Sequence, residues 1–467
     1  MLGEDTLSGM TEMAPKAYRS FTSRRPIRGI CLDPSKGADL AMKKSNLSPS
    51  KTKISFSILI LLFILFAAGS ASAQGNPPTI QGPMLKVVAG PASPTPSYFP
   101  RTINPGHAPQ SATITVDYKL GNLVGCATTV DSWDDTPPGD TSTLKQAFER
   151  AVATWEATLD SPIEIRVEAT LENIGGSTLG YMGPRATANW GSQPVNDVWF
   201  PFALADKISG SDLAPGNYDI IGKMTCREDW NTDDASTDGD GYSGEYDFES
   251  VALHELGHGL GFVGGATYDS GTGKGGVRDD TYKFPWVYTC FTGSTNPHGR
   301  YLLNTTEFPE DSVAMGNVLI NKGGTSNNGE PGIYFYGNDA VLANNGPIKL
   351  YTPNTWSSGS SYSHLDSNEF NGTAEDLMTP SIGPADITRA VGPVTKGMFD
   401  DFGWSGGTFN AEACASPTPN TVIVQDMVTT YSWSYLKTRD NNILLIALAG
   451  IMVLALGGMG VFLHRRA

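Results

Sequence analysis

Hydrophobic and polar residues follow regular periods in the central part of the chain. Residues 111–119 (SATITVDYK) and 163–171 (IEIRVEATL) alternate with a period of two, which is typical of half-buried strands, and residues 218–226 (YDIIGKMTC) are a further strand candidate. Residues 143–159 predict an amphipathic helix, because their apolar side chains recur at helical spacing. These apolar positions are Leu144, Phe148, Ala151, Val152 and Trp155.

The most apolar segments lie near the two ends. Residues 58–68 form an uncharged run between a lysine-rich stretch and small residues, which is the pattern of a secretory signal peptide cut near Ala73. A membrane anchor is the alternative, although this run is short for a bilayer. Residues 443–463 carry no charge over about 30 Å of helix and predict a single transmembrane helix, with a cleaved sorting tail as the alternative.

These segments divide the 467 residues into parts. Residues 74–110 are proline-rich, and residues 411–442 are a polar stalk. One domain with long loops fits the region between them better than two. The expected parts are an extension from an upstream start or a cytoplasmic tail (1–41), signal peptide (42–73), linker or pro-segment (74–110), main domain (111–410), stalk (411–442), transmembrane helix (443–463) and cytoplasmic tail (464–467).

The charge balance separates the ends from the exported part. Of 32 Lys and Arg and 48 Asp and Glu, ten basic and five acidic residues lie in residues 1–53 and two arginines in the tail, which leaves 20 basic and 43 acidic residues and a net charge of −23. Binding of nucleic acid needs a basic face, so nucleic acid is not expected as a partner. The expected location is the cell surface, where the C-terminal helix would anchor the protein in the membrane.

Four of the five cysteines lie in the exported part. They are Cys126, Cys226, Cys290 and Cys414. An even number in an oxidising compartment predicts two disulfides, with three connectivities open.

Residues 247–261 (DFESVALHELGHGLG) carry the chemistry that is easiest to interpret. Asp247 suits the N-cap of a buried helix. His254 and His258 are four residues apart, so both imidazoles leave one face of that helix and can bind one ion. Glu255 follows the first histidine, where it reaches a water on the metal without binding the metal. This HExxH arrangement predicts a zinc hydrolase site.

A catalytic zinc ion takes three protein ligands and keeps one open position. Among the other histidines, His107 lies in the proline-rich segment and His298 in a turn, which leaves His364 in SSYSHLD as the best candidate. Asp366 is a fallback ligand. A glutamate ligand from a downstream helix is a weaker alternative, because Pro309 interrupts the segment in which it would lie.

The order of these motifs resembles that of the leishmanolysin-like metzincins, a group of zinc metallopeptidases with a long insertion before the third histidine. The sequence HELGHGLGF matches the start of HExxHxxGxxH, although Gly264 occupies the third histidine position, and SHLD and DLMTP follow about a hundred residues later. The resemblance implies that His364 is the third ligand, that Met378 is the Met-turn residue and that Gly261 lets the chain leave the helix. No cysteine in residues 74–115 is available as a latency switch.

The fold implied by the resemblance is an α+β, metzincin-like domain with a twisted mixed sheet, an active-site helix and a loop-rich insertion at about 266–360, followed by the transmembrane helix. The implied activity is zinc-dependent hydrolysis of peptide bonds in protein or peptide substrates, with Glu255 taking the proton of the attacking water. A surface adhesion or binding protein that has kept the scaffold and lost activity is the rival.

A second metal site is weaker. Residues 234–245 (DASTDGDGYSGE) place Asp234, Asp238 and Glu245 near the spacing of a calcium loop. An acidic, solvated loop is the simpler interpretation, because no helix precedes it. Calcium is therefore an open alternative and zinc the main expectation.

Overall fold

The structure is a computed structural model, and all the residues it describes belong to the compact unit of residues 73–467. They are residues 78–92, 96–101, 112–227, 229–234, 244–294, 300–321, 332–404, 409 and 411–414. The expected N-terminal extension, signal peptide, stalk, transmembrane helix and cytoplasmic tail lie outside them.

The regular hydrophobic patterns form elements close to the expected bounds. The expected helix is α2, Leu144–Thr158, and Thr143 caps it in a capping box with Gln146. The expected strands are β4 (Ile114–Leu120), β5 (Ile165–Glu172) and β9 (Ile220–Thr225). In β5, buried and half-buried residues alternate along all eight positions, so the sequence period reports one covered face.

These strands belong to a six-stranded mixed sheet with the order β18-β2-β6-β9-β5-β4. Strands β4, β5 and β9 are parallel, whereas β6 (Thr178–Pro184) runs antiparallel to β9. Strand β2 (Leu85–Ala89) is antiparallel to β6 and parallel to β18 (Ser381–Ile382). The N-terminal segment is therefore inserted between two later parts of the chain.

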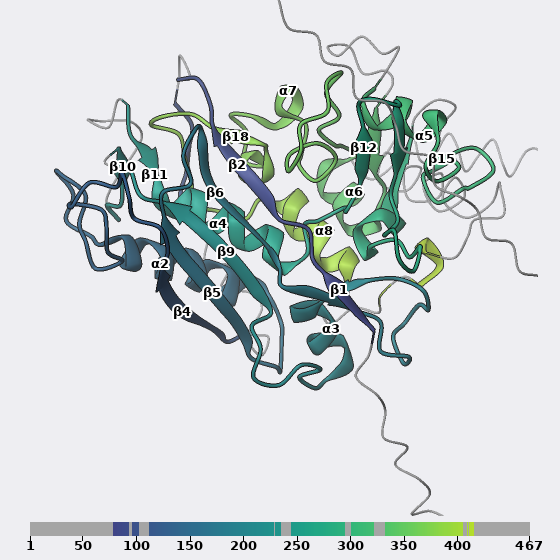
Figure 1. Cartoon of the computed structure of the whole chain (residues 1–467), viewed down its shortest axis with the longest axis horizontal. Helices are drawn as coiled ribbons and strands as arrows, with labels where there is room; N and C mark the ends of the chain where they lie inside the picture. The colour runs from purple at the N-terminus through teal and green to yellow at the C-terminus, as the bar shows by residue number, and fades with distance from the viewer. Residues whose placement is uncertain are drawn as a thin grey trace, which may run out of the picture. The chain divides into compact units, whose positions relative to one another are not determined.

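Helix α4 (Phe248–Leu260) packs against this sheet and against α2. In Figure 1, β2 crosses in front of α4. Trp155 of α2 is fully buried, and its indole N–H donates to the carbonyl of Leu253 in α4 at 2.8 Å. Helix α8 (Pro393–Phe402) completes the layer through Phe399, whose ring lies 4.7 Å from that of Trp155. The sheet and α2 thus hold α4, and α8 packs against Trp155 of α2.

Short elements make up the rest of the described chain. Before the insertion they are β1 (Thr79–Gln81), β3 (Tyr98–Phe99), β7 (Ala186–Ala188), β8 (Phe200–Pro201), α3 (Phe202–Ser209), β10 (Trp230–Asn231) and β11 (Tyr246–Asp247). In the insertion they are β12 (Thr267–Asp269), β13 (Lys274–Gly276), η1 (Val287–Phe291), β14 (Thr292–Ser294), β15 (Arg300–Tyr301), α5 (Val313–Leu319), β16 (Ile333–Phe335), α6 (Asn338–Asn344) and β17 (Ile348–Lys349). After it follow α7 (Ser367–Phe370), η2 (Asp376–Met378), β19 (Ile387–Thr388) and η3 (Ala411–Ala413).

Two disulfides pair the four exported cysteines. Cys126 is bonded to Cys226, and Cys290 is bonded to Cys414. The first bond links the loop after β4 to the end of β9, and the second ties the insertion to the chain after α8. Of the three connectivities left open by the sequence, the structure therefore has the sequential one, in which the first cysteine pairs with the second and the third with the fourth.

The fold class expected from the sequence is wrong. The expectation was an α+β, metzincin-like domain with a twisted mixed sheet and a loop-rich insertion, followed by a transmembrane helix. The structure is instead mixed α/β with several separate sheets, including the four-stranded sheet β15-β14-β16-β17 of the insertion. Among the described residues, no helix has the length and apolar character needed to cross a bilayer. The longest helix of the described residues, α2, has 15 residues, about 22 Å against the roughly 30 Å of a hydrocarbon core.

Candidate metal centre

Helix α4 carries the first two histidines of the site in a fully buried position. Asp247 caps the helix, as expected, and accepts from the N–H of Ser250 at 2.8 Å. Every residue of the helix is buried. The spacing of four residues brings the rings of His254 and His258 to 4.6 Å between centroids, so both point to one side.

The structure brings His364 to these two histidines from 106 residues further along the chain. The Nε2 atom of His258 lies 2.9 Å from that of His254 and 3.1 Å from that of His364. The Nε2 atoms of His254 and His364 are 3.3 Å apart. Three ring nitrogens therefore surround one point.

The other ring nitrogen of each histidine is held by a backbone carbonyl. His254 Nδ1 lies 2.6 Å from the oxygen of Leu377, and His258 Nδ1 lies 2.8 Å from that of Phe262. His364 Nδ1 lies 2.7 Å from the oxygen of Ser360. A carbonyl can only accept, so each Nδ1 is the protonated donor and each Nε2 of a neutral ring presents a lone pair.

Three lone pairs facing one another repel unless a cation lies between them, so this donor set fits a metal ion. Ligand nitrogens on a tetrahedral zinc ion are about 3.3 Å apart, given bonds of about 2.0–2.1 Å, and the three observed separations are near that value. Burial lowers the pKa of His254 to about 4 and those of His258 and His364 well below their ordinary range. The rings are thus neutral, as metal ligands must be.

Glu255 lies beside the histidines and is fully buried. Its Oε1 accepts from the N–H of Val87 in β2 at 3.0 Å, and its Oε2 accepts from the N–H of Met182 in β6 at 2.8 Å. Burial raises the pKa of Glu255 well above its ordinary value, against the effect of these two hydrogen bonds. The carboxylate therefore bridges two strands of the sheet.

Met378 packs under the helix between its two histidines. A Cβ added to Gly257 would lie 2.9 Å from the sulfur of Met378, so only glycine allows this approach. Gly261 ends the helix with a φ of +133°, a conformation that other residues avoid. Met378 thus lies close to the helix at Gly257, and Gly261 ends the helix in the left-handed region of φ.

The chain around His364 is fixed on both sides. Its backbone carbonyl accepts from Tyr351, and the N–H of Leu365 donates to the carbonyl of Met378, both at 2.8 Å. The N–H of Gly264 donates to Ser363 Oγ at 3.0 Å. The segment that bears the third histidine therefore lies directly against the exit of α4, although the insertion separates them in sequence.

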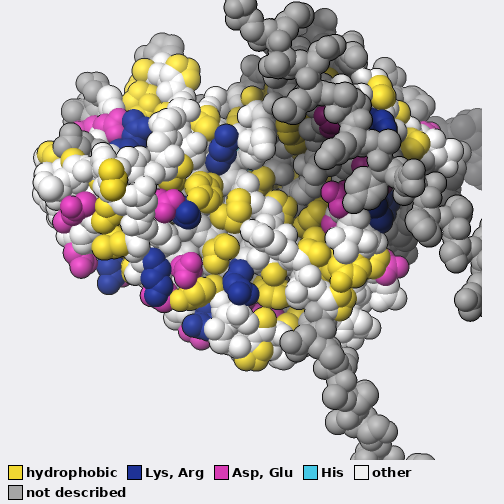
Figure 2. All heavy atoms as spheres, viewed as in Figure 1, with side chains coloured by type: hydrophobic (Ala, Val, Ile, Leu, Met, Phe, Trp, Pro, Cys, Tyr) yellow, Lys and Arg dark blue, Asp and Glu magenta, His cyan; other side chains and the backbone are white. Residues whose placement is uncertain are grey.

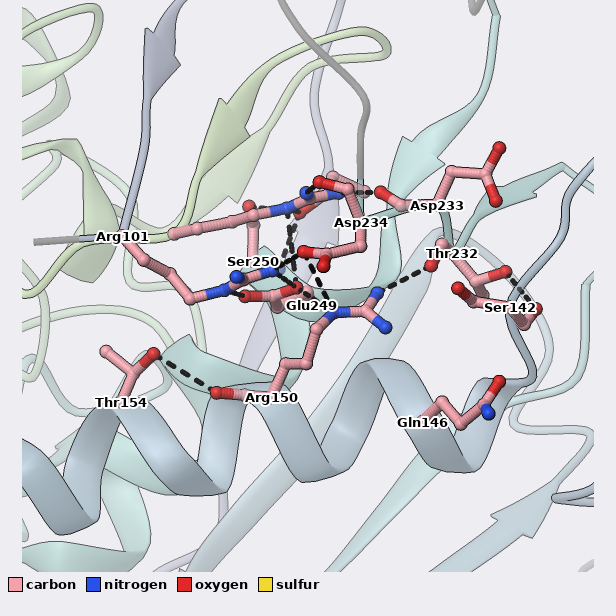
Figure 3. A network of polar contacts seen from close by, with 12 residues as sticks. Arg101, Ser142, Gln146, Arg150, Thr154, Thr232, Asp233, Asp234, Glu249 and Ser250 are labelled. Carbon is pink, nitrogen blue, oxygen red and sulfur yellow. Dashed lines mark hydrogen bonds and ion pairs between the residues drawn. The ribbon is translucent and has the colours of Figure 1, made fainter. Parts of the chain in front are cut away.

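The other end of α4 carries a charged network that the sequence did not indicate (Figure 3). Glu249 is fully buried and forms ion pairs with Arg101, with Arg150 at 2.7 Å and with Arg389 at 3.6 Å. Arg389 also pairs with Asp247 at 2.5 Å. Three arginines from distant parts of the chain thus neutralise the first turn of the helix.

The remaining candidates do not join the histidines. Among the described residues, the metal-binding group of side chains consists of His254, His258 and His364. Asp366, the fallback ligand, instead caps α7 and pairs with Lys349 at 3.6 Å.

The calcium residues are only partly described. The carboxylate of Asp234 is paired with Arg101 and lies 3.6 Å from Arg150. Burial raises the pKa of Glu245. Asp238, like His107 and His298, lies outside the described residues.

Sequence reasoning missed the partners of Glu255. Strand β2 carries a short alternation, in which Leu85 and Val87 are buried and Lys86 and Val88 are half-buried, but the prolines around it concealed the signal. Comparisons of the chain with protein-family models, curated proteins and solved structures gave no match. Function must therefore be inferred from the geometry of the site.

Proposed function

We propose that the protein is a zinc-dependent endopeptidase that resembles the leishmanolysin-like metzincins. The observation that carries the proposal is the convergence of three neutral Nε2 atoms from His254, His258 and His364 within 3.3 Å, with a carboxylate on the adjacent residue. Three imidazoles and one open position are the ligand set of a catalytic zinc ion.

Each group has one role in this proposal. A zinc ion held by the three histidines would act as a Lewis acid and lower the pKa of a bound water. Glu255 would accept the proton of the attacking water and pass it to the leaving amine. The carbonyls of Leu377, Phe262 and Ser360 orient the imidazoles, and Met378 supports the helix beneath them.

The two disulfides support a location outside the cytoplasm, because reducing compartments disfavour such bonds. A protein or peptide substrate from the same compartment is the partner that this activity requires.

A binding protein without activity is the second candidate. One observation favours it: His258, Glu255 and His364 are all 0% exposed, so the site as described admits no substrate. An adhesion protein would need the histidines for structure alone, and Glu255 would serve only to bridge β2 and β6.

Metal content and turnover separate these candidates. We expect one zinc ion per full-length chain by elemental analysis, and cleavage of a peptide library that stops on chelation. Glu255→Gln should keep the zinc and lose the cleavage, since the amide is no base. Equal cleavage by Glu255→Gln would contradict the proposed role of this residue, and absence of zinc from a folded chain would refute the metal centre.

A further inference from the structure

The metal centre is closed by another part of the chain. His254 is 2% exposed and the other ligands and Glu255 are 0% exposed. The cavity next to His254 has a volume of about 10 Å³, room for about one water molecule. No histidine of the described residues is visible on the face shown in Figure 2. A peptidase with these ligands needs an opening wide enough for an extended peptide.

Strand β2 fills the place of that opening. It is bonded on one side to β6, antiparallel, and on the other to the chain that follows Met378, parallel. The N–H of Lys86 donates to the carbonyl of Gly359 at 3.0 Å, and the N–H of Val88 donates to that of Pro380 at 3.2 Å. An extended peptide that binds a protein by strand addition makes contacts of this kind.

One peptide group of β2 faces the catalytic carboxylate. The N–H of Val87 donates to Glu255 Oε1 at 3.0 Å, so the Lys86–Val87 bond lies where a substrate would offer its leaving nitrogen. Because Oε2 is occupied by Met182, both oxygens of Glu255 are engaged by N–H groups. With β2 in place, both carboxylate oxygens are therefore directed at backbone N–H groups of the neighbouring strands.

Val87 is 2% exposed and lines the small cavity beside His254. The lining combines apolar residues, among them Val251, Leu377 and Ile382, with polar ones, among them Ser250, Asp376, Thr379, Ser381 and Thr388. A second cavity, of about 270 Å³, lies at the N-terminal end of the strand, where Leu85, Tyr268 and Trp356 are among the residues that line it.

We propose that the segment formed by residues 78–92 and 96–101 is an intramolecular inhibitor, whose strand Leu85–Ala89 occupies the peptide-binding groove of the enzyme in the manner of a substrate. The inference rests on the proposed function and extends it in two ways. It makes the full-length chain at least tenfold less active than a chain whose groove is open. It also assigns the ligand class of the groove: an extended peptide with a small, branched aliphatic side chain at the position of Val87.

The contacts that hold this segment are all reversible. Strand β1 pairs with β7, β3 pairs with β19, and Arg101 forms ion pairs with Glu249 and Asp234. The cysteines of both disulfides lie after the segment, so no covalent cross-link retains it. Cleavage after Arg101, or a competing peptide, would therefore release the groove.

The test uses the full-length chain produced with cobalt(II) in place of zinc, and acetohydroxamate as a small metal-binding probe. Val87→Lys puts a much longer side chain against a cavity of only about 10 Å³ and should expel β2. We expect the probe to change the cobalt absorption spectrum of this variant at a concentration at least tenfold lower than in wild type. Val124→Lys, at an exposed position outside the segment, makes the same substitution and should respond like wild type.

Equal access of acetohydroxamate in all three chains would overturn the inference. Peptide cleavage is measured in parallel and should rise at least tenfold in Val87→Lys. If that variant binds the probe but cleaves nothing, the closure of the groove by β2 is supported and the peptidase activity is refuted. If wild type cleaves as fast as the variant, the inhibitor is refuted and the peptidase is retained.

Two further reagents keep the test decisive if Val87→Lys fails to fold. Val87→Ala only shortens the side chain and should give about fivefold easier access of the probe. A synthetic peptide of residues 82–92 (GPMLKVVAGPA) should inhibit the opened chain, whereas the same peptide with lysine at the position of Val87 should not. Equal inhibition by both peptides would contradict the pocket assignment.

Discussion

The two ends of helix α4 are equally buried but differ in how their charges are balanced. At the N-terminal end, Asp247 and Glu249 are surrounded by arginines (Figure 3). At the C-terminal end, Glu255 has only backbone N–H partners, and the neighbouring histidines have only carbonyls. At the first end, arginine side chains balance the negative charges. At the second end, the lone pairs of the histidines and the carboxyl group of Glu255 have no cationic side chain as a partner among the described residues.

This difference separates a structural network from a functional site. Buried charges are retained when they are paired, and an unpaired group changes its pKa instead. The arginines supply the charge for one end in advance. In the proposed metal centre, the cation of the other end would be a bound metal ion.

The largest effect should come from removing the third histidine. His364→Ala leaves two imidazoles. Loss of a group that only hydrogen-bonds a metal ligand lowers metal affinity by roughly 10- to 100-fold, so loss of a ligand itself should lower zinc affinity by more. Competition with a chromophoric chelator measures this change. Asp366→Asn is the matched control, because the amide can still cap α7, and its affinity should equal that of wild type. An unchanged affinity in His364→Ala would exclude this residue as a ligand.

The opposite end of the helix should respond in stability rather than in metal binding. Glu249→Gln leaves three arginines facing a neutral amide and should lower the free energy of unfolding by about 3 kcal/mol. Urea denaturation measures it. Glu149→Gln on α2 removes an exposed partner of Lys145 and should have no measurable effect. Should both variants be equally stable, Glu249 does not organise the network.

A smaller effect tests the contact between helix and Met-turn. Gly257→Ala would stabilise an ordinary helix by up to about 1 kcal/mol. Here the new methyl meets the sulfur of Met378 at 2.9 Å and the ring of Trp155 at 3.2 Å, so we expect a loss of about 1–2 kcal/mol. In a Met378→Ala background the same change should become less unfavourable. Thermal unfolding of the four chains checks the coupling, and additive effects would contradict the contact.

How much the sequence predicts depends on whether a feature is local. Helix α2 and strand β5 agree with their hydrophobic periods, because each buries one face. His254 and His258 are found from a spacing of four residues. His364 is predicted only by discarding the other histidines and by the resemblance to a known family, because 106 residues separate it from His258.

Contacts between distant segments left no signal in the sequence. Arg389 reaches Asp247 over 142 residues, and Val87 reaches Glu255 over 168. Such pairings are fixed by the packing of the whole sheet, and a strand of five residues between prolines does not specify its partners. The charged end of α4 and the closed state of the metal centre were therefore visible only in the structure.

Two buried aspartates without a cation between them give the smallest expected effect and extend the comparison beyond α4. Asp206 of α3 and Asp219 are 2% and 5% exposed, and burial raises the pKa of both, with Asp212 adding to the effect and Arg166 opposing it at Asp219. Between the ordinary aspartate pKa and these raised values, the folded state binds more protons than the unfolded state. Stability should therefore fall as pH rises through that window.

Asp206→Asn removes the titrating group and keeps an oxygen that can accept from the N–H of Leu213, which now donates to Asp206 Oδ1 at 2.9 Å. We expect the loss of stability between pH 5 and pH 9 to be about 1 kcal/mol smaller in this variant than in wild type, measured by urea denaturation at each pH. Asp134→Asn, at an exposed position, controls for net charge. Equal slopes in all three chains would mean that the pair stays ionised when buried, and that a buried carboxylate here does not need the arginines that surround Glu249.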